Sequence, residues 1–242
     1  MQKWFGPWIN QPFQLFGTSH LIMLIVFLLG MSVFYLFSAN IRKGTRTHQV
    51  IRWGLFALLI SCEISYQIWT LTNSVFSPTE HLPLHLCGIA SLIAMIGLLT
   101  YQKKLIQINY FIGIIPAMLA LITPDIPHGY EHFRFWKFFL HHMAIPWASF
   151  FLILTSSVSI NRRVMFETYS YLILYAVVIG CMNQLIGSNY LYLGGPPAAN
   201  TPLNYLGDGL WYYLNLSLLA LAAFSFMLWI YRSSHFMLSK KE

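Results

Sequence analysis

Charged residues are scarce in this chain. Only 9% of its 242 residues are Asp, Glu, Lys or Arg, and 57% are hydrophobic. A soluble domain carries about 25% charged residues. A surface so poor in charge would not stay in water, which excludes a soluble globular protein and makes lipid the expected solvent. Acidic residues are rarer still, and the formal net charge is +7.

Long polar segments and a cysteine framework are also missing. The loops between apolar runs are too short to build a second core, so we expect residues 1–242 to form one transmembrane domain. Cys62, Cys87 and Cys181 all lie in apolar segments, which argues against a disulfide framework. The basic residues sit in short loops between these segments, so they indicate topology and not nucleic-acid binding.

Apolar runs of membrane length are abundant. A helix needs about 20 residues to cross the hydrocarbon core. The sequence therefore predicts an all-α polytopic membrane bundle of seven transmembrane helices. The predicted spans are residues 20–38, 52–73, 84–101, 105–123, 139–159, 166–187 and 210–231.

The 14 Lys and Arg residues are unevenly divided between the two sets of loops. One set holds Lys3, Arg134 and Lys137. The other set holds Arg42, Lys43, Arg46, Arg52, Lys103, Lys104, Arg162, Arg163, Arg232, Lys240 and Lys241. Because Lys and Arg favour cytoplasmic loops, we predict an N-terminus outside and a C-terminus in the cytoplasm.

Most of the nine histidines fall at predicted outer span ends. Polar residues close to the membrane core are usually functional, so this clustering predicts a polar site on the outer face. The residues concerned are His20, His81, His85, His128, His132, His141 and His142.

Cys87 is the candidate nucleophile. Pro83 marks a helix start, which places Cys87 in the first turn of the third span, where the helix N-terminus favours the thiolate. His85 is two residues away and faces elsewhere, so a base must come from another helix. His141 and His142 open the predicted fifth span at matching depth. A Cys–His pair is what nucleophilic acyl transfer needs, although a cysteine in an apolar segment more often serves packing.

Two further polar positions lie within the predicted spans. Glu63 is the one acid deep inside a span, with Gln67 on the same helix face. It has the chemistry to orient a histidine, to bind a proton, or to be protonated and structural. Asn183 and Gln184 on the sixth span have the donors to stabilise an oxyanion or to join helices.

A zinc site is an alternative use of the histidines. His81 and His85 are separated by four residues, as are His128 and His132, a spacing that suits zinc on a helix. Pro83 interrupts the first pair, however, and no HExxH motif is present. We therefore predict no metal and no other cofactor.

Several short motifs, in this order and spacing, resemble the bacterial YwaF-like membrane proteins, a group similar to the animal transmembrane protein 164 family. The motifs are Phe16-Gly17-Thr18-Ser19-His20, Leu82-Pro83-Leu84-His85-Leu86-Cys87, Phe138-Phe139-Leu140-His141-His142, Gly187-Ser188-Asn189-Tyr190-Leu191-Tyr192-Leu193, Pro196-Pro197, Leu206-Gly207 and Trp211-Tyr212-Tyr213. One departure is Gly88, because many YwaF-like sequences carry an acid directly after the cysteine.

The resemblance implies a seven-span acyltransferase of the bacterial plasma membrane. Its relatives move fatty acyl chains between phospholipids and lysophospholipids with a cysteine nucleophile and a histidine. These roles map onto Cys87 and onto His142 or His141. His20, His85, Glu63 and Asn183 are the expected supporting residues.

Three alternatives stay open. A proton-coupled transporter or permease would use Glu63 and the outer histidines. A zinc-dependent intramembrane hydrolase would use the histidines as ligands, and a sensor or scaffold would act through a partner. The lipid bilayer and a phospholipid or lysophospholipid substrate are the partners that the acyltransferase prediction requires.

Overall fold

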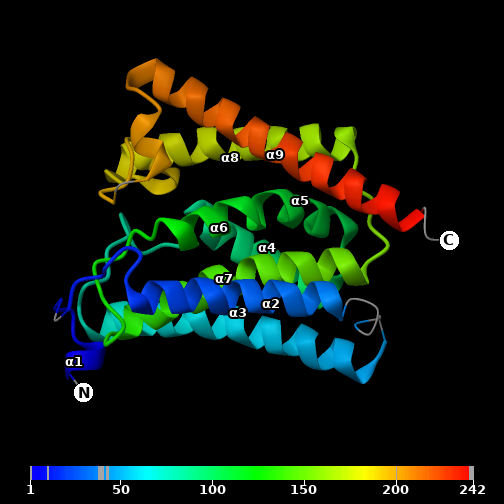
Figure 1. Ribbon diagram of the computed structural model, residues 1–242. Helices are drawn as coiled ribbons and strands as arrows, with labels where there is room; N and C mark the ends of the chain where they lie inside the picture. The colour runs from blue at the N-terminus through cyan, green and yellow to red at the C-terminus, as the bar shows by residue number, and fades with distance from the viewer. Residues whose placement is uncertain (1, 10, 38–40, 42–43, 200, 240–242) are drawn as a thin grey trace.

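The computed structural model describes residues 2–9, 11–37, 41, 44–199 and 201–239. These residues form α-helices and two short 3₁₀ turns around one bundle (Figure 1). The helices are α1 (Gln2–Phe5), α2 (Thr18–Leu36), α3 (Arg46–Thr72), α4 (Leu86–Thr100), α5 (Lys103–Gly113), α6 (Ile115–Ile122), α7 (Phe133–Thr155), α8 (Arg162–Ile186) and α9 (Gly209–Ser239), with η1 (Tyr190–Tyr192) and η2 (Pro202–Tyr205) between the last two.

The prediction of an all-helical membrane bundle is confirmed. Within the described residues, 6 helical segments are long and apolar enough to cross a membrane. The predicted span 84–101 corresponds to α4, which has 15 residues and falls short of the usual length for a crossing. The count of seven therefore stays a prediction.

Two predicted spans have different bounds in the structure. The segment 105–123 consists of α5 and α6, separated at Ile114, because Pro116 lacks an N–H and its ring crowds the carbonyl of Ile112. The fifth span begins at Phe133 and not near 139. Residues 133–138, which we expected in a loop, therefore form the first turns of α7.

Helix ends follow from local sequence. The Thr45 hydroxyl accepts a hydrogen bond from the His48 backbone N–H (3.1 Å) at the start of α3, and the Asn161 side chain caps α8 in the same way through Val164 (3.0 Å). Gly187 ends α8 at φ 69°, a left-handed conformation that glycine adopts without strain.

α3, α5 and α8 begin at the end of the bundle where α9 finishes (Figure 1). Arg46, Lys103 and Arg162 therefore lie at one common end, as the loop grouping predicted. Arg42, Lys43, Lys240 and Lys241, counted with them, lie outside the described residues.

α7 is the central helix of the first layer. It packs against α2, α3, α4, α5 and α6. Its inward side chains are completely buried, as expected of a helix that packs against several neighbours. They include Phe135, Phe139, Ile145, Phe151 and Leu152.

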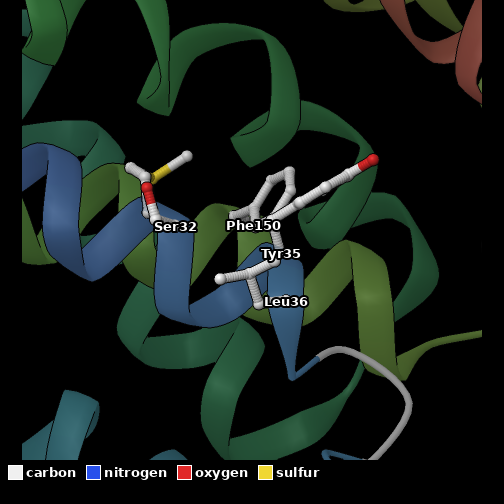
Figure 2. A pocket seen from close by; sticks show the side chains of 5 residues that line it. Ser32, Tyr35, Leu36 and Phe150 are labelled. Atoms are coloured by element: carbon white, nitrogen blue, oxygen red, sulfur yellow. The ribbon is translucent and has the colours of Figure 1, made fainter.

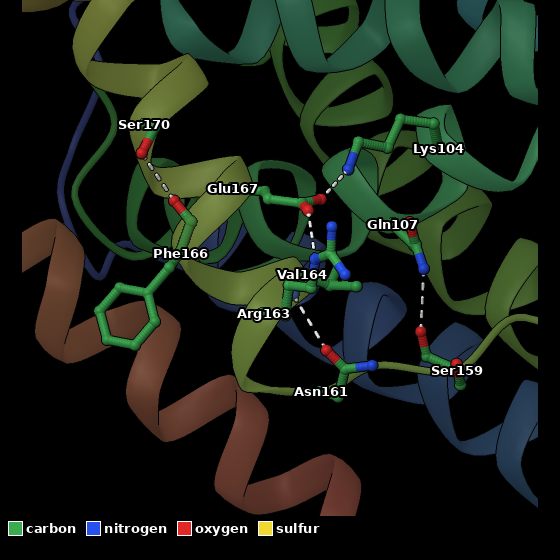
Figure 3. Close-up of polar contacts among 9 residues, drawn as sticks. All are labelled: Lys104, Gln107, Ser159, Asn161, Arg163, Val164, Phe166, Glu167 and Ser170. Carbon is green, nitrogen blue, oxygen red and sulfur yellow. Dashed lines mark hydrogen bonds and ion pairs between the residues drawn. The ribbon is translucent and has the colours of Figure 1, made fainter.

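α8 and α9 pack on each other and form a second layer (Figure 1). One end of this layer is tied to α5. Glu167 of α8 pairs with Lys104 of α5 and accepts a hydrogen bond from Arg163 (3.0 Å), and Gln107 donates to the Ser159 carbonyl (3.0 Å) (Figure 3). These bonds fix the layers together at the end that holds Arg162.

The N-terminal segment folds over the loop at the opposite end. Phe13 N–H donates to the Pro127 carbonyl (3.0 Å), and the His132 ring donates to the Gly6 carbonyl (2.7 Å). The ring of His128 stacks on that of His132 with centroids 4.0 Å apart. Neither ring nitrogen of His128 has a hydrogen-bond partner among the described residues.

This stacked pair makes stability depend on pH. Burial, and then the neighbouring His132, lower the pKa of His128 from 6.5 to about 4. Below pH 6.5 the unfolded chain binds a proton that the folded chain excludes, so stability falls as the pH drops from about 6.5 to about 4. His128→Phe keeps the stacking ring and cannot titrate. We expect its melting temperature to equal that of the wild type at pH 7.5 and to exceed it at pH 5. Equal melting temperatures at pH 5 would contradict this assignment.

Close packing of α2 on α7 depends on Gly30. A Cβ at Gly30 would lie 2.3 Å from the Trp147 ring. Gly30→Ala should therefore lower the free energy of unfolding by about 1–3 kcal/mol, as overpacking typically does. Gly54→Ala in α3 is the matched control, because nothing lies within 4 Å of its added Cβ. Thermal unfolding in detergent measures both, and equal melting temperatures would show that α2 can shift away without cost.

Candidate active site

A cavity of about 1080 Å³ lies at the end of the bundle opposite to the ion pair between Lys104 and Glu167. α6, α8 and α9 supply an apolar wall that includes Leu119, Ala176 and Ala220. The end of α3 and the starts of α4 and α7 supply polar side chains. A large apolar cavity with a few convergent polar groups is the usual form of a small-molecule site.

A second hollow, of about 410 Å³, lies between α2 and α7 near the other end (Figure 2). Its lining residues are Met31, Ser32, Tyr35, Leu36 and Phe150. Tyr35 and Leu36 are each 72% exposed, so the hollow is a shallow surface depression. It holds no cysteine, histidine or carboxylate, and the larger cavity is the candidate site.

The loop that leads into α4 is held by two tyrosines. The Tyr190 hydroxyl donates to the Pro78 carbonyl (2.7 Å) and accepts from the Leu82 N–H (3.0 Å). The Tyr175 hydroxyl donates to the Leu84 carbonyl (2.8 Å). Tyr175 lies in α8 and Tyr190 in the loop between α8 and α9. The second layer therefore positions the start of α4.

Cys87 is the second residue of α4, as Pro83 predicted. His85 is the N-cap residue and makes no side-chain capping bond, so the first backbone N–H groups of the helix stay available. A Cβ on Gly88 would lie 2.6 Å from the Pro83 carbonyl oxygen. A side chain at position 88, including the acid that the resemblance led us to expect there, therefore does not fit without a shift of the backbone.

His141 and His142 lie in the third turn of α7 and not at its opening, because the helix begins at Phe133. The His142 Nδ1 makes a hydrogen bond of 2.8 Å with the Phe138 carbonyl. A carbonyl only accepts, so Nδ1 carries the proton and Nε2 of the neutral ring is the basic nitrogen. His141 is 3% exposed, and its buried Nε2 has no partner among the described residues.

Cys87, His141 and His142 line the same cavity, although Cys87 comes from α4 and the two histidines come from α7. Lys137 lies within Coulombic range of all three. Among the described residues, no hydrogen bond joins Cys87 to either histidine. Such bonds are often formed only when substrate is bound.

His85 also lines the cavity and packs between two tyrosines. Its ring centroid is 5.2 Å from that of Tyr190 and 5.0 Å from that of Tyr192. The Tyr192 hydroxyl donates to Asp125 (3.2 Å). His85 is within Coulombic range of both Asp125 and His142.

Glu63 and Asn183 reach the cavity but are engaged locally. Gln67 donates to Glu63 (3.0 Å) and to the His81 carbonyl (2.9 Å), as the shared helix face suggested for the first bond. The Asn183 amide donates to the Tyr190 carbonyl (2.9 Å), and its oxygen accepts from the Tyr190 N–H (3.0 Å). Asn183 therefore holds Tyr190, and its amide is not directed at an oxyanion.

His20 does not line the cavity. Its Nδ1 accepts from the Phe16 N–H (3.0 Å), and its Nε2 donates to the Leu121 carbonyl (2.8 Å). With no exposed surface, His20 joins α2 to α6 as a structural residue.

Sequence reasoning missed several cavity residues. Arg134 and Lys137 were counted as loop charges, although α7 carries them on the face of His141. Arg134 and Lys137 precede His141 by seven and four residues, a spacing that places all three on one helix face. The sequence would have indicated this if the predicted fifth span had begun at residue 133. Tyr66 and Asp125 also line the cavity, and only the tertiary structure brings them there.

The described part of the chain contains no cluster of side chains that would support the zinc alternative. No group of three or more His, Cys, Asp or Glu side chains there is arranged to hold a metal ion. His81 lies against Tyr66, whereas the His128–His132 pair lies against the N-terminal segment.

Comparison with known proteins identifies the family. The model of the TMEM164 family matches residues 15–228. The chain belongs to the TMEM164 family. The matched segment contains α2 through α8, most of α9 and every residue of the cavity. The resemblance to the transmembrane protein 164 family is thus confirmed, whereas the YwaF-like group is not separately identified. No curated protein and no solved structure matches the chain.

The close approach at Gly88 predicts a sensitive position next to Cys87. Gly88→Ala should displace the first turn of α4. In a Cys62→Ala, Cys181→Ala background, the rate at which a maleimide labels the Cys87 thiol should therefore change by about threefold or more. Gly180→Ala, which also lines the cavity, meets only ordinary contact at 3.7 Å and should leave the rate unchanged. An unchanged rate in Gly88→Ala would show that the turn absorbs the methyl group.

Proposed function

We propose that this member of the TMEM164 family is a lipid acyltransferase in which Cys87 is the nucleophile and His142 the general base. One observation carries the proposal: Cys87 of α4 and His142 of α7 line the same cavity, and the hydrogen bond from His142 Nδ1 to the Phe138 carbonyl makes Nε2 the basic nitrogen. The cavity also offers an apolar wall for acyl chains.

The reaction follows from these groups. His142 Nε2 takes the proton of the Cys87 thiol, and the thiolate attacks the acyl carbonyl of a phospholipid. Collapse of the tetrahedral intermediate breaks the acyl C–O bond and leaves an acyl thioester, and the imidazolium protonates the departing lysolipid oxygen. The hydroxyl of a second lysolipid molecule then loses its proton to His142 and attacks the thioester. The C–S bond breaks, and the Cys87 thiolate takes the proton back from His142. With water as acceptor, the same steps amount to hydrolysis.

The start of α4 is suited to the negative charge that develops on the carbonyl oxygen. Its first N–H groups are uncapped by side chains and adjoin Cys87. Backbone donors at a helix N-terminus stabilise such an oxyanion. They replace Asn183, whose amide is used to hold Tyr190.

The topology is part of the proposal. If α4 and the broken α5–α6 segment each cross the bilayer, the chain makes seven passes, with an outer N-terminus and a cytoplasmic C-terminus in a bacterial plasma membrane. The cavity then opens near the outer leaflet. Reporter fusions active only outside, placed after residues 80 and 130, should be active, and activity of a fusion after residue 160 would contradict this orientation.

The decisive experiment compares cysteine variants in a lipid turnover assay. Purified protein is incubated with phospholipid and labelled lysophospholipid, and products are read by mass spectrometry. Cys87→Ala should lose at least about a hundredfold in rate, because the proposed mechanism forms the thioester on Cys87. Cys181→Ala is the matched control: Cys181 is a free cysteine of the same cavity and should be dispensable.

Substitutions of the two histidines should lower the rate to different extents in the same assay. His142→Gln should lower the rate by about 10²–10⁴, the usual contribution of a general base. His141→Gln should have a smaller effect. Equal turnover by Cys87→Ala and wild type would disprove the mechanism, and absence of turnover in folded wild type, with flux in vesicles that depends on Glu63, would favour the transporter.

A further inference from the structure

Two cations of α7 lie in the cavity against one aromatic ring. The Lys137 Nζ is 4.2 Å from the centroid of Tyr66, and the Arg134 Cζ is 5.8 Å from the same centroid. Arg134 is also 5.4 Å from the Trp69 ring, which stacks on Tyr66. Tyr66 and Trp69 of α3 thus form an aromatic floor, the pair of rings against which the two cations lie. The two positive charges are within Coulombic range of each other.

Neither cation has a carboxylate partner in the part of the chain that the structure describes. The ion pairs found there join Lys3 to Glu131, and Lys104 and Arg163 to Glu167. Cation–π contact holds a cation in place but does not neutralise it. Two like charges held together in a site shielded from water repel each other, and an anion placed between them removes that cost.

Three carboxylates, Glu63, Glu80 and Asp125, also line the cavity, and none of them forms an ion pair with either cation in the part of the chain that the structure describes. Glu63 accepts a hydrogen bond from Gln67, and Asp125 accepts one from Tyr192. Glu63 is within Coulombic range of Lys137 without forming an ion pair with it. The donors of Lys137 are therefore left for a ligand.

The position of Lys137 relates this charge to the proposed reaction. Lys137 is one helical turn before His141 and within Coulombic range of Cys87 and His142. In a glycerophospholipid, only a few bonds separate the acyl ester from the phosphate. A lipid whose ester carbonyl meets Cys87 can thus place its phosphate against Lys137.

We propose that Lys137 and Arg134 form an anion subsite that binds the phosphate of the lipid substrate and positions its ester against Cys87. This inference rests on the proposed function for the ester, whereas the binding of phosphate stands on the two cations and their aromatic floor. Arg134 offers a planar fork of donors and Lys137 a single mobile ammonium, which is a common pairing for phosphate.

The test measures binding without turnover. In a Cys87→Ala background, the affinities of a lysophosphatidylglycerol and of a monoacylglycerol with the same acyl chain are determined by tryptophan fluorescence. The phosphate-bearing lipid should bind at least about tenfold more tightly, because charge-assisted hydrogen bonds are strong in a shielded site. Lys137→Gln should bring the two affinities within about twofold and leave that of the monoacylglycerol unchanged.

Three controls make the result specific. Lys137→Arg should keep the preference for the phosphate-bearing lipid, since it keeps the charge. Arg134→Gln should reduce the preference. Lys3→Gln, which removes a cation paired with Glu131 outside the cavity, should leave the preference unchanged.

The outcomes separate this inference from the proposed reaction. An unchanged preference in Lys137→Gln, or an equal loss of affinity for both lipids, would overturn the subsite while leaving acyl transfer through Cys87 intact. Absence of turnover in the wild type would not alter the binding result. If inorganic phosphate alone displaces the lysophosphatidylglycerol at equal concentration, the subsite is one for free phosphate and the lipid assignment is wrong.

Discussion

The burial of α7 among five helices is the constraint on which the site depends. Phe135 and Phe139 fix the first turns of the helix in the core, and Ile145 and Phe151 fix the rest. A helix anchored in this way has one face left for polar groups. Lipid cannot solvate a charge, so that face must meet a cavity. Arg134, Lys137, His141 and His142 all line the cavity for this reason.

The two layers are joined at one end and enclose the cavity at the other. The ion pair between Lys104 of α5 and Glu167 of α8 joins them at one end, and the opposite end holds the cavity. The apolar wall comes from α6, α8 and α9, which suits acyl chains, and the polar end comes from α3, α4 and α7. A lipid with a charged head and long chains matches this division of surface, whereas a small polar solute would leave most of the wall unused.

Tyr190 connects the second layer to the candidate nucleophile. Asn183 of α8 holds the backbone of Tyr190 through both its amide and its carbonyl oxygen. The Tyr190 hydroxyl in turn bonds to the backbone of Pro78 and of Leu82, nine and five residues before Cys87. Asn183 therefore supports the loop before α4 through Tyr190, and His20 joins α2 to α6.

The sequence by itself determined the membrane class, the approximate spans, the helix start before Cys87 and the family. These properties depend on composition, on apolar run length and on local signals such as Pro83, all of which are recorded in neighbouring residues. It also indicated that polar residues gather at one end of the bundle, since alternating passes bring every second loop together.

Only the tertiary structure decided the start of α7, the shortness of α4 and the membership of the site. Residues 133–138 are rich in aromatic and basic side chains, and they are helical because Phe135 and Phe139 pack in the core, a contact that no local pattern reveals. The role proposed for His142 depends on one hydrogen bond to the Phe138 carbonyl, whereas His20 bonds to a carbonyl 101 residues away. Whether a histidine serves as a base or as a structural link depends on what its ring nitrogens meet, and that depends on how the helices pack.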